Sequence, residues 1–116
     1  MTSLVKIVTK LLGIVLLLAG IAGFFVNGSL LGFEVDSVRN VIHIVTGLVA
    51  LVAAGTYSYA RLFLIVFGIL FGLVTILGLM NGDVLGLFSV NMEDNYLHGA
   101  ISLLCLLTGF GSRPSA

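Results

Sequence analysis

The chain contains two histidines, His43 and His98, and both lie in the motif F-x-V-x(4)-N-x(2)-H, which occurs twice. In each copy an asparagine precedes the histidine by three residues, Asn40 in the first and Asn95 in the second. Neutral imidazoles are common ligands of metal ions and haem. Asparagine and histidine together can also bind a small solute or relay protons. These four residues are therefore the candidate ligand site, or polar layer, of the protein.

The sequence does not place the parts of a catalytic centre near one another. Cys105 lies deep in an apolar stretch with no base near it in sequence, so we interpret it as a small packing residue. A single cysteine excludes an internal disulfide and a metal site built from several cysteines. Because no nucleophile with a base and an orienting group is visible, we expect a protein that is not an enzyme.

The composition predicts an integral membrane protein. Of the 116 residues 59% are hydrophobic and only 9% are charged, and the mean hydropathy is +1.27. A soluble domain carries about 25% charged residues. Lysine and arginine together number 5, as do aspartate and glutamate. No basic field is therefore available for nucleic acid, and the lipid bilayer is the expected partner.

Four stretches contain the roughly 20 mainly apolar residues that a membrane helix needs. They are about residues 4–26, 37–57, 62–80 and 92–110. The first stretch, with basic residues near its start and small residues near its end, also fits a secretion signal. We assign it to the fold because it has a counterpart in the second half of the chain.

The distribution of charge predicts the orientation in the membrane. In a four-span bundle the basic residues at the termini and in the connection between spans two and three share one face, namely Lys6, Lys10, Arg61 and Arg113. The acidic residues fall on the opposite face, where Arg39 is the only basic residue. Basic residues are mainly retained on the cytoplasmic side, so we expect both termini to be cytoplasmic.

A shift of 55 residues aligns the chain with itself without a gap, residues 6–55 on residues 61–110. Each copy holds two spans, so both copies enter the membrane from the same side, and a pseudo-twofold axis along the membrane normal relates them. The sequence therefore predicts an all-α fold, a four-transmembrane-helix bundle built from two tandem helical hairpins. It forms one domain, residues 1–116, with repeat one at about 4–57 and repeat two at about 61–112.

Asp36 and Asn91 occupy matched positions before spans two and four, and both are good N-cap residues. At a rise of about 1.5 Å per residue, each histidine lies roughly 10 Å inside the start of its helix. The same helix face continues with small residues, which let membrane helices approach closely. This predicted packing seam consists of Gly47, Ala50, Ala54, Ser102, Cys105 and Gly109. We expect spans two and four to form the central pair, with spans one and three flanking them through their own glycines.

The two predicted outer loops, residues 27–35 and 81–90, are short and apolar, and both open with Asn-Gly, a turn signal. Their apolar residues are Leu30, Leu31, Phe33 and Val35 in the first loop and Leu85, Leu87, Phe88 and Val90 in the second. We expect these loops to fold over the mouth of the bundle and to cover the layer of asparagine and histidine.

Three interpretations of that layer remain open. It is a structural layer of interhelical hydrogen bonds, which contribute about 0.6 kcal/mol each on average in membranes. Alternatively, His43 and His98 bind haem, a chlorophyll-type pigment or a metal ion such as zinc. In the third interpretation the layer binds a small solute or relays protons, although no span carries the interior carboxylate or proline break typical of transporters.

The stretches G-F-E-V-D-S-V-R-N-V-I-H-I-V-T-G and L-F-S-V-N-M-E-D-N-Y-L-H resemble the bacterial four-span membrane proteins of domain of unknown function family 4383. That family typically shows G-x-F-x-V, then N-x-x-H and a helical glycine, and later D-N-x-L-H. The matching residues are Phe33, Val35, Asn40, His43, Gly47, Asp94, Asn95, Leu97 and His98. The resemblance covers nearly the whole chain and implies a bacterial inner-membrane location, but the family has no assigned activity. The outer loops of this chain are shorter than those associated with the family.

These observations together predict a small integral membrane protein that is not catalytic. We expect an accessory or structural subunit that packs against a larger membrane complex, or against further copies of the chain. The alternatives are a bundle that binds haem, pigment or metal through His43 and His98, and a transporter of small solutes or protons.

Overall fold

The computed structural model describes residues 2–26, 29–30, 33–34 and 36–112. Four helices account for most of this part of the chain: α1 (Thr2–Gly23), α2 (Ser37–Ala53), α3 (Tyr57–Asn81) and α4 (Met92–Gly111). The predicted all-α class is confirmed. Arg113, Leu31, Val35 and the predicted Asn27-Gly28 turn lie outside the described residues.

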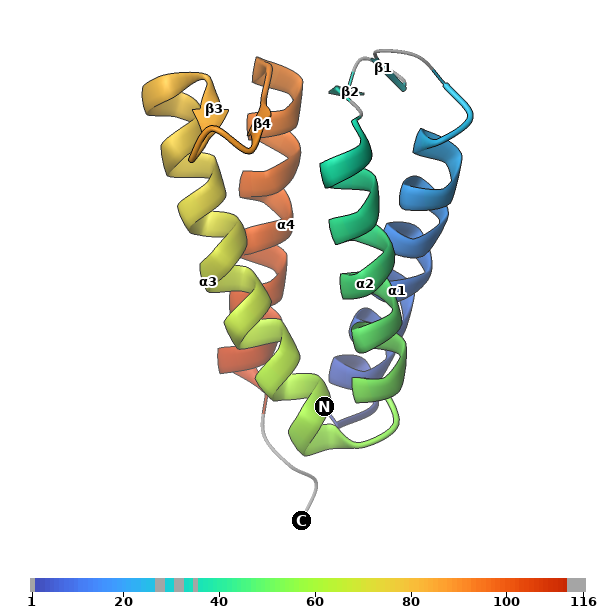
Figure 1. Ribbon diagram of the computed structural model, residues 1–116. Helices are drawn as coiled ribbons and strands as arrows, with labels where there is room; N and C mark the ends of the chain where they lie inside the picture. The colour runs from blue at the N-terminus through green and yellow to red at the C-terminus, as the bar shows by residue number, and fades with distance from the viewer. Residues whose placement is uncertain (1, 27–28, 31–32, 35, 113–116) are drawn as a thin grey trace.

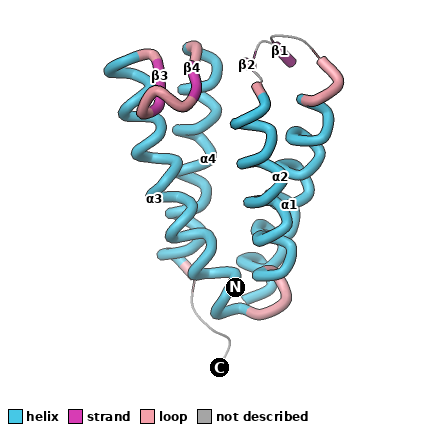
Figure 2. The backbone as a smooth tube through the Cα atoms, in the orientation of Figure 1, coloured by secondary structure: helices cyan, strands magenta, loops and turns pink. Residues whose placement is uncertain are grey.

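The helices are arranged as two antiparallel pairs, α1 with α2 and α3 with α4 (Figure 1). The start of α1, the α2–α3 connection and the end of α4 lie at one end of the molecule. At the other end a short antiparallel ribbon joins the helices of each pair (Figure 2). The strands are β1 (Ser29–Leu30) with β2 (Phe33–Glu34), and β3 (Asp83–Val84) with β4 (Phe88–Ser89).

Both predicted N-caps are confirmed. The side chain of Asp36 accepts a hydrogen bond of 2.8 Å from the backbone N–H of Arg39. Asn91 accepts one of 2.8 Å from the backbone N–H of Asp94, whose carboxylate in turn accepts from the backbone N–H of Asn91 at 3.0 Å. This reciprocal capping box satisfies two amides that the first turn of a helix otherwise leaves without partners. The caps therefore fix where α2 and α4 begin.

The helices of each pair approach closely at the predicted glycines. A Cβ atom on Gly13 of α1 would lie 3.0 Å from the carbonyl oxygen of Gly47 in α2. A Cβ atom on Gly68 of α3 would lie 2.8 Å from Leu106 in α4. The small residues of α2 and α4 thus meet α1 and α3 in their own hairpins, rather than each other. This arrangement differs from the predicted central pair of spans two and four, because each small-residue face is already covered within its hairpin.

The two hairpins join through α1 and α3, in the half of the molecule near the termini. The buried apolar residues there are Val5, Leu12, Leu16, Ala60, Leu64, Phe67, Phe71 and Cys105. Thr9, which is fully buried, donates from its hydroxyl to the carbonyl oxygens of Val5 at 2.8 Å and Ala60 at 3.4 Å. Larger side chains fill the space between hairpins, whereas glycines line the space within them.

Two helical segments, Leu4–Gly23 and Tyr57–Asn81, are long and apolar enough to cross a membrane by length and composition. Ser37–Ala53 is also apolar but shorter, at 17 residues. Only Ala54, Gly55 and Thr56 separate α2 from α3. Helix α2 ends at Ala53, short of the predicted end near residue 57, and Tyr57 instead begins α3, ahead of the predicted start near residue 62.

Candidate functional site

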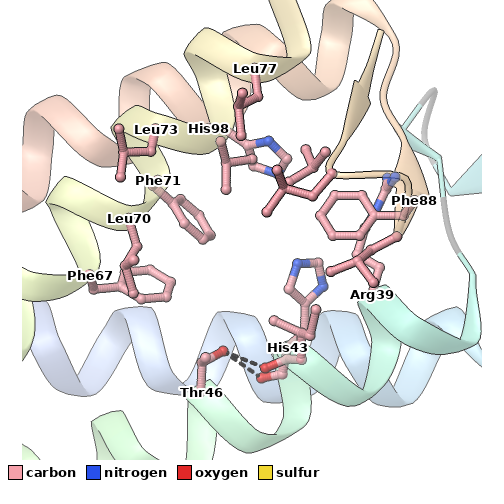
Figure 3. A pocket seen from close by; sticks show the side chains of 15 residues that line it. Arg39, His43, Thr46, Phe67, Leu70, Phe71, Leu73, Leu77, Phe88 and His98 are labelled. Carbon is pink, nitrogen blue, oxygen red and sulfur yellow. Dashed lines mark hydrogen bonds between the residues drawn. The ribbon is translucent and has the colours of Figure 1, made fainter. Parts of the chain in front are cut away.

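The two histidines line one cavity between the hairpins, near the end with the β-ribbons. The cavity has a volume of about 340 Å³, and its walls come from α2, α3, the β3–β4 ribbon and α4. Most of the lining is aliphatic or aromatic, and the polar side chains are Arg39, His43, Thr46 and His98. Figure 3 shows the imidazoles of His43 and His98 on opposite sides of this space. The fold therefore brings together two side chains that lie far apart in the sequence.

His98 is the more deeply buried of the two, with 5% of its surface exposed. Its ring lies edge-on to the ring of Phe71, with centroids 5.1 Å apart and an angle of 63° between the planes. Its Nδ1 atom is buried and has no hydrogen-bond partner among the described residues. A buried polar atom of this kind costs about 1–3 kcal/mol relative to one that is hydrogen-bonded. His98 thus lines a mainly apolar cavity while one of its own ring nitrogens stays buried without a partner in the described residues.

Asn40 and Asn95 are not part of this cavity lining. Each packs against a glycine of the neighbouring helix in its own hairpin, Asn40 against Gly23 and Asn95 against Gly78, where a Cβ atom would overlap the amide. The Oδ1 atom of Asn95 is buried without a hydrogen-bond partner in the described part of the chain. A separation of three residues turns a side chain by about 60° around the helix axis. This difference is enough to direct asparagine and histidine to different neighbours, so they do not form the shared layer that we expected.

An ion pair that the sequence pattern did not predict lies at the ribbon end of the cavity. Arg39 of α2 donates to the carboxylate of Asp94 in α4 at 3.3 Å, and the exposed fractions of the two side chains are 4% and 3%. Asp94 therefore lies buried in the first turn of its helix, not on an exposed outer face. This placement corrects the expectation that no span carries an interior carboxylate.

Arg39 also holds the β3–β4 ribbon. Its guanidinium donates to the carbonyl oxygen of Ser89, lies 4.7 Å from the centroid of the Phe88 ring, and is 3.6 Å from the carboxylate of its own N-cap, Asp36. A buried arginine in such a position is stabilised only when charge partners and acceptors surround it. The sequence did contain a signal for the ion pair, because Asp94 stands in the second motif copy where Arg39 stands in the first.

The second outer loop covers the cavity. The lining residues that it provides are Val84, Leu85, Leu87 and Phe88. Leu85 adopts a left-handed backbone conformation, with φ of 53°, and is followed by Gly86 at φ of 73°. These two residues turn the chain between β3 and β4, which places apolar side chains of the ribbon over the histidines. The side chains of the first loop lie outside the described part of the structure.

The residues of the predicted packing seam lie within the hairpins and not at the cavity. Ser102 donates from its hydroxyl to the carbonyl oxygen of Gly68 at 2.6 Å. Arg61 donates from Nε to the carbonyl oxygen of Gly109 at 2.8 Å. Ala50 and Cys105 are fully buried, and each would contact a Cβ atom placed on the glycine opposite, Gly13 and Gly68 respectively. Ala54 is the C-cap of α2.

A second cavity of about 340 Å³ continues the first along the space between α2 and α3. Both cavities are lined by Thr46, Phe67 and Leu70. The described residues contain no group of three or more His, Cys, Asp or Glu side chains that could hold a metal ion. The arrangement thus offers two imidazoles and an elongated apolar space, rather than a protein-built metal centre.

Comparison with known proteins gave one match. A family model described as a domain of unknown function, DUF4383, matches residues 6–111, which include both copies of the histidine motif. No curated protein and no solved structure matches the chain.

Proposed function

The chain belongs to the DUF4383 family, and we propose that it is a non-catalytic integral membrane protein that binds an apolar ligand in the cavity between its two helical hairpins. The family has no assigned activity, so the proposal rests on the surface, the internal symmetry and the cavity.

The apolar surface supports four membrane spans. Large hydrophobic side chains are exposed on every helix, for example Leu18 on α1, Val52 on α2, Leu73 on α3 and Leu107 on α4. Soluble monomers rarely expose contiguous apolar patches of this kind, whereas lipid solvates them. The 17 residues of α2 measure about 25 Å at 1.5 Å per residue, close to the roughly 30 Å of a bilayer core. We therefore propose that α2 and α4 also span the membrane, beside α1 and α3.

Equivalent contacts support a tandem repeat. Gly13 contacts Ala50 as Gly68 contacts Cys105, and Asn40 packs on Gly23 as Asn95 packs on Gly78. In each comparison both partners are shifted by the same 55 residues. Arg39 and Asp94 are themselves separated by 55 residues, so the ion pair joins two equivalent positions. Such a contact is expected where a pseudo-twofold axis passes between the hairpins.

The ends of the molecule support the orientation proposed from charge. Lys6 and Arg61 lie toward the end that contains the start of α1 and the α2–α3 connection (Figure 1). Tyr59 is exposed toward that end and Tyr96 toward the ribbon end, as expected for aromatic residues at the two membrane interfaces. We therefore place both termini in the cytoplasm and the cavity in the outer half of a bacterial inner membrane.

One observation carries the ligand proposal: the imidazoles of His43 and His98, from two different hairpins, line one otherwise mainly apolar cavity. Polar atoms buried in a membrane protein are costly and mark functional sites by default. A volume of about 340 Å³ lies within the roughly 300–1,000 Å³ that is usual for small-molecule sites. A bound molecule would fill the space and contact both imidazoles.

A second candidate is an accessory subunit of a larger membrane complex, or of a homo-oligomer. Its support is the same exposed apolar surface, since lipid-facing and protein-facing sides have similar compositions in membranes. This role is compatible with ligand binding, and it is tested by the proteins that co-purify in mild detergent.

The experiment for the ligand proposal is purification from native membranes, followed by native mass spectrometry, an absorption spectrum and metal analysis. We expect one retained apolar compound per chain, and less of it in a His98→Phe variant. A Soret or pigment band that is lost in His43→Ala and His98→Ala variants would identify the compound as haem or a chlorophyll-type pigment. A chain that retains no small molecule and takes up none from added lipid extract would overturn the proposal.

A further inference from the structure

We propose that the ligand is an isoprenoid quinone, whose ring lies between His43 and His98 and whose tail follows the groove between α2 and α3. This inference rests on the proposed function, because it names the chemical class that the cavity accepts. The shape of the space, its aromatic wall and its hydrogen-bonding groups each favour this class of ligand.

The shape fits a head with a long tail. The cavity that contains the histidines and the second cavity adjoin, because Thr46, Phe67 and Leu70 line both, and we treat them together as one groove. On α3 the residues that line this groove extend from Tyr59 to Leu77, which is about 27 Å at 1.5 Å per residue. One leaflet of a bilayer core is only about 15 Å deep. A compact solute would leave most of this length empty, whereas a prenyl chain would fill it.

The groove opens sideways, toward the region that lipid occupies if the helices span a membrane. Leu70 and Leu73 line the first cavity and are also 52% and 53% exposed. Leu85 of the β3–β4 ribbon lines the same cavity and is 75% exposed. A molecule dissolved in the bilayer could therefore enter from the membrane, without passing through water.

An aromatic row forms one wall and ends at a histidine. Phe63 and Phe67 stack with centroids 5.0 Å apart, and Phe67 and Phe71 lie 4.1 Å apart. Phe71 in turn contacts the ring of His98 edge-on. Flat rings pack favourably against such surfaces in offset or edge-to-face geometry. The part of the ligand nearest His98 is therefore expected to be a flat ring.

The hydrogen-bonding groups favour an uncharged head with an acceptor at each edge. A neutral imidazole offers one N–H donor, and the imidazoles of His43 and His98 face the space from opposite sides (Figure 3). The one cation of the lining, Arg39, is engaged by Asp94, Asp36 and the carbonyl oxygen of Ser89. An anionic head would compete with these partners. The two carbonyl oxygens of a quinone need only the two imidazole donors.

The test measures binding of menaquinone-4 to the full chain by native mass spectrometry from detergent micelles. We expect a one-to-one complex, and binding at least about ten-fold weaker for a polyprenyl hydrocarbon of equal length, since the hydrocarbon cannot accept a hydrogen bond. His98→Phe should weaken menaquinone-4 binding by about ten-fold and leave hydrocarbon binding unchanged. His43→Phe provides a second, independent removal of a donor, in case His98→Phe does not fold.

The groove has its own matched pair of variants. Leu70→Trp fills the junction of the two cavities and should abolish binding. Leu79→Trp places the same side chain on an exposed position of α3 outside the lining and should not affect it.

The outcomes separate this inference from the proposed function. Equal menaquinone-4 binding by the wild type, His98→Phe and His43→Phe would overturn the assignment of the head group. Binding of phosphatidylglycerol or another apolar compound, but not of menaquinone-4, would refute the quinone and leave the ligand cavity standing. Failure of every apolar probe to bind would reject both.

Discussion

The buried ion pair of Arg39 and Asp94 is the contact at which we expect a single substitution to change stability most. Each side chain is almost fully buried, and the pair joins α2 of one hairpin to α4 of the other. Breaking a buried ion pair by removing one partner is costly because the remaining charge stays buried, whereas replacing both charges can be nearly neutral. This asymmetry makes the pair testable.

We expect Arg39→Met to destabilise the protein by about 3–5 kcal/mol, since Asp94 is then left without its cation. The double variant Arg39→Met with Asp94→Asn should recover much of this loss, because asparagine keeps a side-chain acceptor for the cap of α4. Thermal unfolding in detergent, followed by circular dichroism at the helix band, measures the effect. Lys10→Met, at an exposed position, serves as the control. Equal unfolding temperatures for Arg39→Met and Lys10→Met would show that the ion pair contributes little.

His98 illustrates the opposite case, a buried polar group that weakens the empty protein. Replacing it with phenylalanine removes an unsatisfied nitrogen and extends the aromatic row of Phe67 and Phe71. We expect His98→Phe to raise the unfolding free energy of the ligand-free protein by about 1 kcal/mol. His43→Phe should change it less, because His43 is only half-buried. A lower unfolding temperature for His98→Phe would mean that the imidazole has a partner in the folded protein.

At the scale of the helices, glycines set how closely each hairpin packs. The glycines opposite Asn40 and Asn95 leave no room for a further atom. A methyl group at such a site forces the neighbouring side chain to shift, at a cost of about 1–3 kcal/mol. This close packing matters most at the end of each hairpin near the cavity, where α2 and α4 begin.

Gly23→Ala and Gly78→Ala are therefore each expected to destabilise the chain by about 1–3 kcal/mol. Gly99→Ala is the matched control, since its Cβ atom would meet Thr75 at an ordinary 3.5 Å. Within a helix that substitution should stabilise by up to about 1 kcal/mol. Unfolding measured in the same detergent compares the three. Similar shifts for all three variants would indicate that the hairpins are packed less closely than the structure describes.

At the scale of the whole molecule, the arrangement places both connections with β-ribbons at one end and the α2–α3 connection at the other (Figure 1). If the four helices span a membrane, these two ends lie on opposite sides of it. The basic residues then fall on the cytoplasmic side.

Labelling of single cysteines tests this orientation. In a Cys105→Ala background, Ser58→Cys should react with a membrane-impermeant thiol reagent only from the cytoplasmic side, and Glu93→Cys only from the outside. Both positions are exposed. Cys105→Ala itself should be tolerated, because Ala50 occupies the equivalent place in the first hairpin. Reaction of both cysteines from the same side would exclude the four-span topology.

The sequence by itself determined the elements and the helix starts. The four helices and the two N-caps, Asp36 and Asn91, follow from local properties of the chain, and each lies near its expected place. Only Leu4–Gly23 and Tyr57–Asn81, however, are long and apolar enough to cross a membrane by length and composition. The small residues along the helices also predicted that helices approach one another closely. These features depend on residues close in sequence or on one repeated pattern.

Only the tertiary structure decided which faces meet. The small residues of α2 and α4 were compatible with packing on each other or on their hairpin partners, since small residues permit close approach to any helix. A short ribbon joins the two helices of each hairpin, whose small-residue faces pack on each other, and α1 and α3 provide the main apolar contact between the hairpins. How the two hairpins pack on each other also decided that His43 and His98 line a cavity, whereas the asparagines one turn earlier do not. The same packing brought Arg39 to Asp94. Contacts between hairpins depend on the relative position of two separate surfaces, and the pattern of residues along one helix does not determine that position.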